Sequence, residues 1–267
     1  MPAFYAHKLF GERVFACLAP SLQEDLALHK AAFILGTQGP DILFYHKPFA
    51  KNETKEKGVQ MHHASAKQFF LDCAALIDST VDKTQSAESA YVAGFICHFM
   101  LDNACHPHIF RLEDTGVAHG LIESEFDKYL KKQQGEKVHK NAAKRLTAKQ
   151  GVAPAVARVL QVQADEVQRA IKTMKRVNGC FSMPLRSFHA FARVLLKKLK
   201  AQKFESMFLH FKDDPECTAL NPTLQTQMEN AVETTAQTIQ AFFDAINDTE
   251  NPVFDLFDKD YKGEKLV

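Results

Sequence analysis

The chain of 267 residues has no tryptophan, only six cysteines and a formal net charge of +1, and each scarcity narrows what the protein can be. The cysteines are scattered and form no Cys-x-x-Cys pair, which argues against a cysteine-rich zinc ribbon and a disulfide scaffold. Without a long basic run, the chain offers no electrostatic surface for tight binding to a nucleic-acid backbone. We therefore expect a cytoplasmic protein with reduced thiols, whose main partner is not nucleic acid.

Long apolar runs are also missing. No stretch approaches the roughly 20 apolar residues that a membrane-spanning helix needs. The chain starts Met-Pro-Ala-Phe-Tyr-Ala-His, with no basic region followed by an apolar core. The sequence therefore predicts no transmembrane segment and no signal peptide.

Glycine and proline are sparse, with 11 and 10 residues, and the segments between them repeat apolar residues at spacings of three and four. This pattern predicts an all-α fold, a single multi-helix bundle with a metal cluster between helices. A loop is predicted over residues 36–48 and an exposed polar segment over 50–57. Helices are predicted over residues 4–18, 21–35, 59–80, 87–106, 119–133, 140–149, 153–176, 184–211 and 222–247.

The simplest domain organisation is one α-helical domain over residues 1–250, followed by a polar, irregular tail over 251–267. A split near residue 135 into a metal-rich half and a packing half is the alternative. Nine of the 12 histidines fall within the first 119 residues. The functional site is therefore expected in a metal-rich part that spans residues 1–130.

One predicted helix carries a row of ionisable side chains. His98, Asp102 and His106 follow one another at intervals of four residues, which stacks them on one face of a helix of about 3.6 residues per turn. Because the residues around His98 and Asp102 are apolar almost all the way round, both are predicted to be buried. A buried carboxylate needs a charged partner or a metal ion.

A second row follows on the next predicted helix, where His119 and Glu123 have the same spacing and Asp127 lies one turn further on. Neighbouring antiparallel helices could bring the two rows together, and Asp41 and the His62-His63 pair would add further donors. Imidazole and carboxylate groups between helices are the ligands of zinc and multi-metal sites. The sequence therefore predicts a metal site.

Four short motifs occur in the order found in bacterial zinc-dependent phospholipases C, and over about residues 1–130 the chain resembles that family. It looks most like an intracellular branch, and the superfamily also contains single-strand-specific zinc nucleases. The small β-sandwich that some secreted members add has no counterpart here. The motifs are Gly39-Pro40-Asp41, Met61-His62, His98-x-x-x-Asp102 followed by His106-Pro107, and His119-x-x-x-Glu123.

The resemblance implies a cluster of two or three zinc ions. The secreted enzymes place an N-terminal tryptophan on the third zinc, and this chain has none. The implied ligands are Asp41, His62, His98 and Asp102 for the first zinc, His106, His119 and Glu123 for the second, and His7 with a bridging Asp102 for the third.

Two ligand positions have alternatives. His62 matches the family position and is favoured over His63. His106 precedes a proline, as in the family, and is favoured over His108, although His108 has the spacing from Asp102 that the secreted enzymes show.

The resemblance implies a zinc-dependent phosphodiester hydrolase acting on a phospholipid or another small phosphodiester. A zinc cluster can lower the pKa of bound water towards about 7, and Asp41 could be the base that orients that water. The alternatives are a single-strand-specific zinc nuclease and a non-catalytic, metal-stabilised protein that binds a lipid or a partner.

The segment 185–211 combines apolar positions such as Phe188 and Leu195 with six basic residues. A basic amphipathic helix can lie on anionic lipid, which leaves peripheral membrane contact open. A core helix with a solvated basic face is the favoured interpretation.

Overall fold

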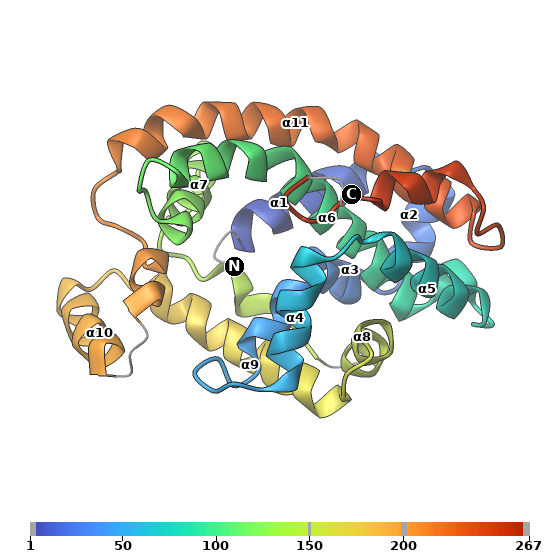
Figure 1. Cartoon of the computed structure of the whole chain (residues 1–267), viewed down its shortest axis with the longest axis horizontal. Helices are drawn as coiled ribbons and strands as arrows, with labels where there is room; N and C mark the ends of the chain where they lie inside the picture. The colour runs from blue at the N-terminus through green and yellow to red at the C-terminus, as the bar shows by residue number, and fades with distance from the viewer. Residues whose placement is uncertain (1–3, 149–150, 199–201, 264–267) are drawn as a thin grey trace.

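The computed structural model describes residues 4–148, 151–198 and 202–263, and every regular element in these ranges is a helix (Figure 1). The all-α prediction is therefore confirmed, and the helices form a single domain. None of the described helices combines the length and the hydropathy needed to cross a lipid bilayer. The α-helices are α1 (Phe4–Ala16), α2 (Pro20–Ala27), α3 (Lys30–Gly36), α4 (Glu53–His63), α5 (Lys67–Asp78), α6 (Ala87–Glu113), α7 (His119–Gln133), α8 (Val152–Leu160), α9 (Ala164–Phe181), α10 (Arg186–Lys198) and α11 (Pro215–Asp244). The 3-10 helices are η1 (Gly39–Tyr45), η2 (Lys83–Gln85), η3 (Ala142–Arg145), η4 (Gln202–Met207) and η5 (Pro252–Phe257).

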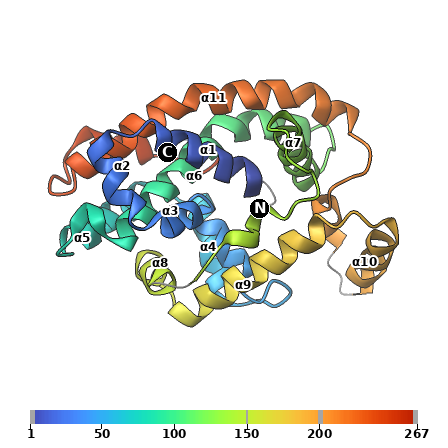
Figure 2. The same cartoon turned by 180° about the vertical axis from the view of Figure 1, so that it is seen from behind.

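Helix α6 forms the centre of the bundle. Its residues from Ala90 to Phe99 are all buried, and all of them except His98 are apolar or small. The Ser86 hydroxyl caps its first turn by accepting from the Ser89 amide at 3.1 Å. It packs against α3 and α11, with the long α11 running along one edge of the molecule (Figures 1 and 2).

The boundaries of several predicted helices are wrong. Predicted helix 21–35 is two helices that meet at His29, and predicted helix 153–176 is broken between α8 and α9, where Gln161 adopts a φ of 50°. Only the short η3 lies within predicted helix 140–149, of which residue 149 falls outside the described ranges. The sequence pattern did not predict these breaks, because apolar residues continue at helical spacing across them.

Helix α4 begins six residues before the predicted start. Asn52 caps it by accepting from the Lys55 amide at 3.0 Å, so most of the segment predicted to be polar and exposed is helical. The chain then ends α4 at His63 and restarts as α5, where one helix over 59–80 was predicted. This break places the end of α4, with His62, beside η1.

The segment predicted to be an irregular tail contains η5 and packs onto the bundle. Val253, Phe254, Phe257 and Tyr261 are buried there. The ring of Phe257 lies 4.0 Å from that of Phe70 on α5, measured between centroids. Charged residues lie between these apolar side chains, so the sequence shows no regular apolar spacing from which their burial could be predicted.

Candidate metal centre

Eight side chains from five elements converge between α1, η1, α4, α6 and α7. They form three groups of imidazoles and carboxylates, in each of which the potential ligand atoms lie within 4.8 Å of one another. All eight are residues named in the sequence analysis. The groups are His7, His98 and Asp102; Asp41, His62 and His98; and His106, His119 and Glu123.

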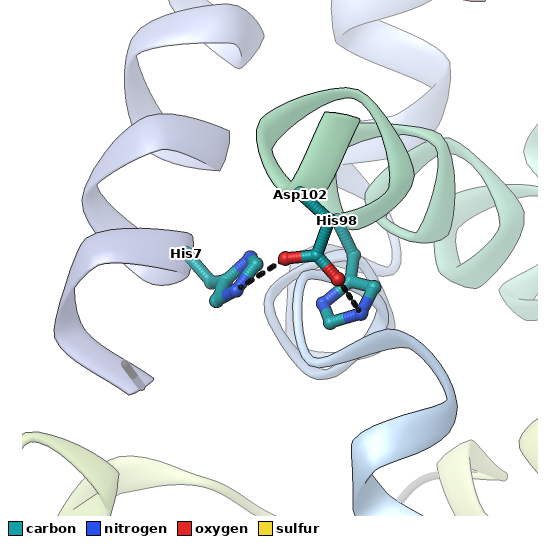
Figure 3. Close-up of side chains that lie close together, drawn as sticks. All are labelled: His7, His98 and Asp102. Atoms are coloured by element: carbon teal, nitrogen blue, oxygen red, sulfur yellow. Dashed lines mark ion pairs between the residues drawn. The ribbon is translucent and has the colours of Figure 1, made fainter. Parts of the chain in front are cut away.

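Asp102 is at the centre of this arrangement. Its Oδ1 lies 3.3 Å from Nε2 of His7 and its Oδ2 lies 3.2 Å from Nε2 of His98, so the carboxylate sits between two imidazoles (Figure 3). Nε2 of His106 is 3.8 Å from Oδ1. Burial alone would raise the pKa of Asp102, but the surrounding imidazoles hold it well below its usual range. Asp102 is therefore an anion at neutral pH.

Two histidines of α6 are oriented by backbone carbonyls. Nδ1 of His98 lies 3.3 Å from the carbonyl oxygen of Thr37, and Nδ1 of His106 lies 2.6 Å from that of Tyr261. A carbonyl oxygen only accepts, so each Nδ1 carries a proton, and Nε2 is the ring nitrogen left to bind a metal ion. Both Nε2 atoms face Asp102.

The same arrangement recurs on α4 and α7. His62 donates from Nδ1 to the Gly58 carbonyl at 2.7 Å, while its Nε2 lies 3.1 Å from Asp41 Oδ1. Nδ1 of His119 is 3.0 Å from Glu113 Oε2, and its Nε2 is 3.3 Å from Glu123 Oε1. An imidazole whose outer nitrogen is held by an oxygen is typical of metal ligands, because the bond fixes both the tautomer and the ring plane.

The donor set fits zinc. Nε2 of His98 is buried and has no hydrogen-bond partner of normal geometry, although it approaches the Asp102 carboxylate. A buried nitrogen without a partner is costly unless a cation takes its lone pair. Imidazole nitrogens with carboxylate oxygens are a common zinc ligand set.

The charges of the outer pairs are strongly coupled. Burial acts against charge on both His119 and Glu123, yet the attraction between them raises the pKa of His119 to about 9 and helps to lower that of Glu123 to about 2. Burial likewise opposes the ionisation of Asp41, but its hydrogen bond from His62 favours the carboxylate, and its pKa lies below the usual value. The carboxylates of this centre are thus held ionised.

Gly39 allows η1 to approach α6. Its φ is +48°, and a Cβ at this position would lie 2.3 Å from Cδ2 of His98, so no larger residue fits without displacing that imidazole. The hydroxyl of Tyr91 on α6 donates to the Gly39 carbonyl at 3.1 Å. These contacts place Asp41, two residues later, beside His62.

Asp127 continues the row of α7 but has a different role. Its carboxylate accepts from the backbone amides of Tyr5 at 3.0 Å and Ala6 at 2.8 Å, which caps the first turn of α1. Burial raises its pKa to about 7, against the opposing effect of Lys131 and these amides. Asp127 thereby fixes the helix that carries His7.

A cavity of about 180 Å³ opens onto the groups. Beside the ligand side chains it is lined by Phe44, Phe110, Tyr261 and Lys262, none of which the sequence analysis identified. In the sequence, Phe44 and Phe110 are indistinguishable from ordinary core aromatic residues. Tyr261 and Lys262 lie in the segment that was predicted to be an irregular tail. No motif spacing connects these residues to the site.

The alternative histidines lie outside the groups formed by the described residues. His63 is exposed and His108 is half-buried, whereas His62 and His106 each join a group. Among the described residues, Asp102 groups with His7 and His98, and His98 also groups with Asp41 and His62.

The model of the family described as zinc dependent phospholipase C matches residues 6–205, a span that includes all eight side chains. The chain belongs to the zinc-dependent phospholipase C family. Searches among curated proteins and among solved structures gave no match. The family is zinc-dependent, so zinc is the metal that the histidines and carboxylates of this site would bind.

Proposed function

We propose that this member of the zinc-dependent phospholipase C family is a phosphodiester hydrolase that acts on a phospholipid or a related small phosphodiester. The observation that carries the proposal is the set of four histidines, each held at Nδ1 by an oxygen and directing Nε2 at a carboxylate. This arrangement prepares the ligands for metal before any metal binds. The set consists of His62, His98, His106 and His119.

We assign two or three zinc ions to these ligands. His106, His119 and Glu123 would hold one ion. His7, His98 and Asp102 would hold zinc as well, since the two oxygens of Asp102 face the two imidazoles. Asp41, His62 and His98 would complete the ligand set.

Zinc ions, when bound, make water more acidic and offset negative charge on phosphate oxygens. The chain's own contribution is to orient water and move a proton. The Asp41 carboxylate lines the cavity, and we assign it to orienting the attacking water and accepting its proton, as the family resemblance implies. The bond from phosphorus to the leaving oxygen then breaks, and that oxygen takes up the proton that the attacking water lost.

Lys262 lines the same cavity, with its ammonium 5.8 Å from the centre of the Phe110 ring. No ion pair joins it to any residue that the structure describes. We assign it to attracting the anionic phosphodiester, because a lysine at a phosphate site acts as a point charge.

The Asp41→Asn variant tests the role of this carboxylate. We expect it to retain most of its zinc and to lose activity by about 10² or more, because it keeps an oxygen donor but cannot accept a proton. Zinc content and hydrolysis of p-nitrophenylphosphocholine are measured on the same preparations. Loss of all metal would instead make Asp41 a plain ligand.

A substrate panel separates this function from its alternatives. The zinc-loaded protein is tested on p-nitrophenylphosphocholine, on other soluble phosphodiesters and on single-stranded DNA. Cleavage of DNA alone would establish a nuclease. Full zinc occupancy without turnover on any substrate would favour a non-catalytic, metal-stabilised protein.

A further inference from the structure

Helix α10 lies at one end of the molecule, beyond α9 (Figures 1 and 2). Several of its apolar side chains are exposed. Phe191 is 65% exposed and Val194 57%, and on this helix the buried side chains are Ala192 and Leu196. The segment 185–211, interpreted as a core helix with a solvated basic face, buries Ala192 and Leu196 against Phe208 and exposes Lys197 and Lys198, but it also leaves apolar side chains exposed. Its residues 199–201 lie outside the described ranges. Leu185, just before α10, and Phe49, after η1, are exposed as well. We call Phe49, Leu185, Phe191, Val194 and Leu195 the apolar rim.

An apolar cavity of about 240 Å³ lies beside the rim. Its walls come from the end of η1 with the residues after it, and from α9, α10 and η4, which follow one another along the chain. They include Phe49, Val177, Phe181, Phe188, Leu195 and Phe208. An exposed apolar patch around an apolar cavity is unfavourable in water and marks a surface that another phase or molecule covers.

The charge of the same region is one-sided. Residues 167–204 include ten lysines and arginines and neither aspartate nor glutamate, although the whole chain has a net charge of only +1. Lys172, Arg176, Lys197 and Lys198 are exposed and take part in no ion pair with any described residue. Arg193 is paired with Glu205. The rim is therefore bordered by positive charge from Arg176, which lines the cavity, and from Lys197 and Lys198 in the last turn of α10.

The cavity adjoins the metal centre through one short element. Tyr45, the last residue of η1, lines the apolar cavity, whereas Asp41 in the same element lines the metal cavity. The short 3-10 helix η1 therefore lies between the apolar cavity and the metal centre.

We propose that the apolar rim and its basic border dock the protein on the surface of an anionic phospholipid bilayer. Apolar side chains surrounded by lysines and arginines suit the boundary between acyl chains and anionic head groups. A symmetric contact between two copies would press the same basic surfaces together, which disfavours self-association. The purpose of docking rests on the proposed function, since it would bring lipid to the metal centre.

Vesicle flotation tests the proposal on the full-length, zinc-loaded protein. Vesicles of phosphatidylcholine with an equal part of phosphatidylglycerol are compared with vesicles of phosphatidylcholine alone. We expect binding to the anionic vesicles, and a partition coefficient lower by about tenfold or more in Phe191→Ser/Leu195→Ser and in Lys197→Glu/Lys198→Glu.

Two matched control variants test whether the effect on vesicle binding is specific to the apolar rim and its basic border. Leu28 is 65% exposed, as Phe191 is, so Leu28→Ser removes a similar apolar surface elsewhere. Lys137→Glu/Lys144→Glu makes the same change in net charge at exposed lysines outside residues 167–204. Both controls should bind like the wild type. Equal loss in the controls, no loss in the α10 variants, or equal binding to neutral vesicles would overturn the proposal.

Hydrolysis of soluble phosphodiesters, measured in parallel, separates this inference from the proposed function. Vesicle binding without turnover would contradict the enzyme assignment alone. Turnover without vesicle binding would overturn the docking surface alone. Sedimentation that shows a dimer, dissolved by Phe191→Ser/Leu195→Ser, would also overturn it in favour of a contact between copies.

Discussion

At the scale of single residues, the centre depends on groups that hold the ligands as much as on the ligands. Asp102 and the histidines around it could be predicted from four-residue spacing and apolar flanks. Their anchors could not, because the carbonyls of Thr37 and Tyr261 are backbone atoms brought near by the fold. Every residue has a backbone carbonyl, so the residue type does not show which carbonyl will accept a hydrogen bond from a histidine.

Asp127 gives a prediction about pH at this scale. Its pKa rises from 3.8 to about 7 on folding, so between these values the folded chain binds the proton more tightly than the unfolded chain. Its contribution to the free energy of unfolding therefore falls as the pH rises from about 4 to about 7. Asparagine cannot titrate, so the advantage of wild type over Asp127→Asn should shrink over this range, by a few kcal/mol at most.

This prediction is checked by urea unfolding of both proteins at several pH values, with a chelator present to remove the contribution of bound metal. A difference between the two proteins that stays constant with pH would show that Asp127 is not the titrating group.

At the scale of elements, η1 connects the metal centre to the rest of the fold. The sequence marked residues 36–48 as an ordered loop through its glycines and prolines, and the structure forms a buried 3-10 helix there. Contact with α6 decides this conformation, since it requires both a positive φ and the absence of a side chain at Gly39. Local patterns cannot report such a long-range approach.

Gly39→Ala should destabilise the protein by about 2–4 kcal/mol, from the positive φ and from the overlap with His98. It should also lower zinc content. Gly135→Ala is the matched control, because Gly135 also has a positive φ but its Cβ would meet nothing within 4 Å. That variant should lose only about 1 kcal/mol and keep its zinc. Equal effects of the two substitutions on stability and zinc would contradict the role of Gly39.

At the scale of the whole molecule, the last described segment of the chain packs against helices formed early in the sequence and contacts the metal centre. The carbonyl of Tyr261 orients His106, and Phe257 packs in the same core as Phe70. Neither contact was predictable, because residues 251–263 have no helical periodicity. The fold class and the ligand-bearing elements were predictable, since they depend on repeats within short segments.

Phe257→Ala should lower the free energy of unfolding by about 3–5 kcal/mol, because the side chain is fully buried. The neighbouring Leu256 is 49% exposed, and Leu256→Ala should cost less than about 1 kcal/mol. Denaturant unfolding of both variants measures this difference. Similar small losses in both would mean that the C-terminal segment is not part of the cooperative core.

The most direct test of the metal centre is zinc content, measured by inductively coupled plasma mass spectrometry on protein purified without a metal-affinity column. Wild type is compared with His98→Ala and with His63→Ala, whose imidazole is exposed and outside the ligand groups. The account predicts two or three zinc ions per chain in wild type and His63→Ala, and a sharp loss in His98→Ala. Substoichiometric metal that does not differ among the three proteins would contradict it.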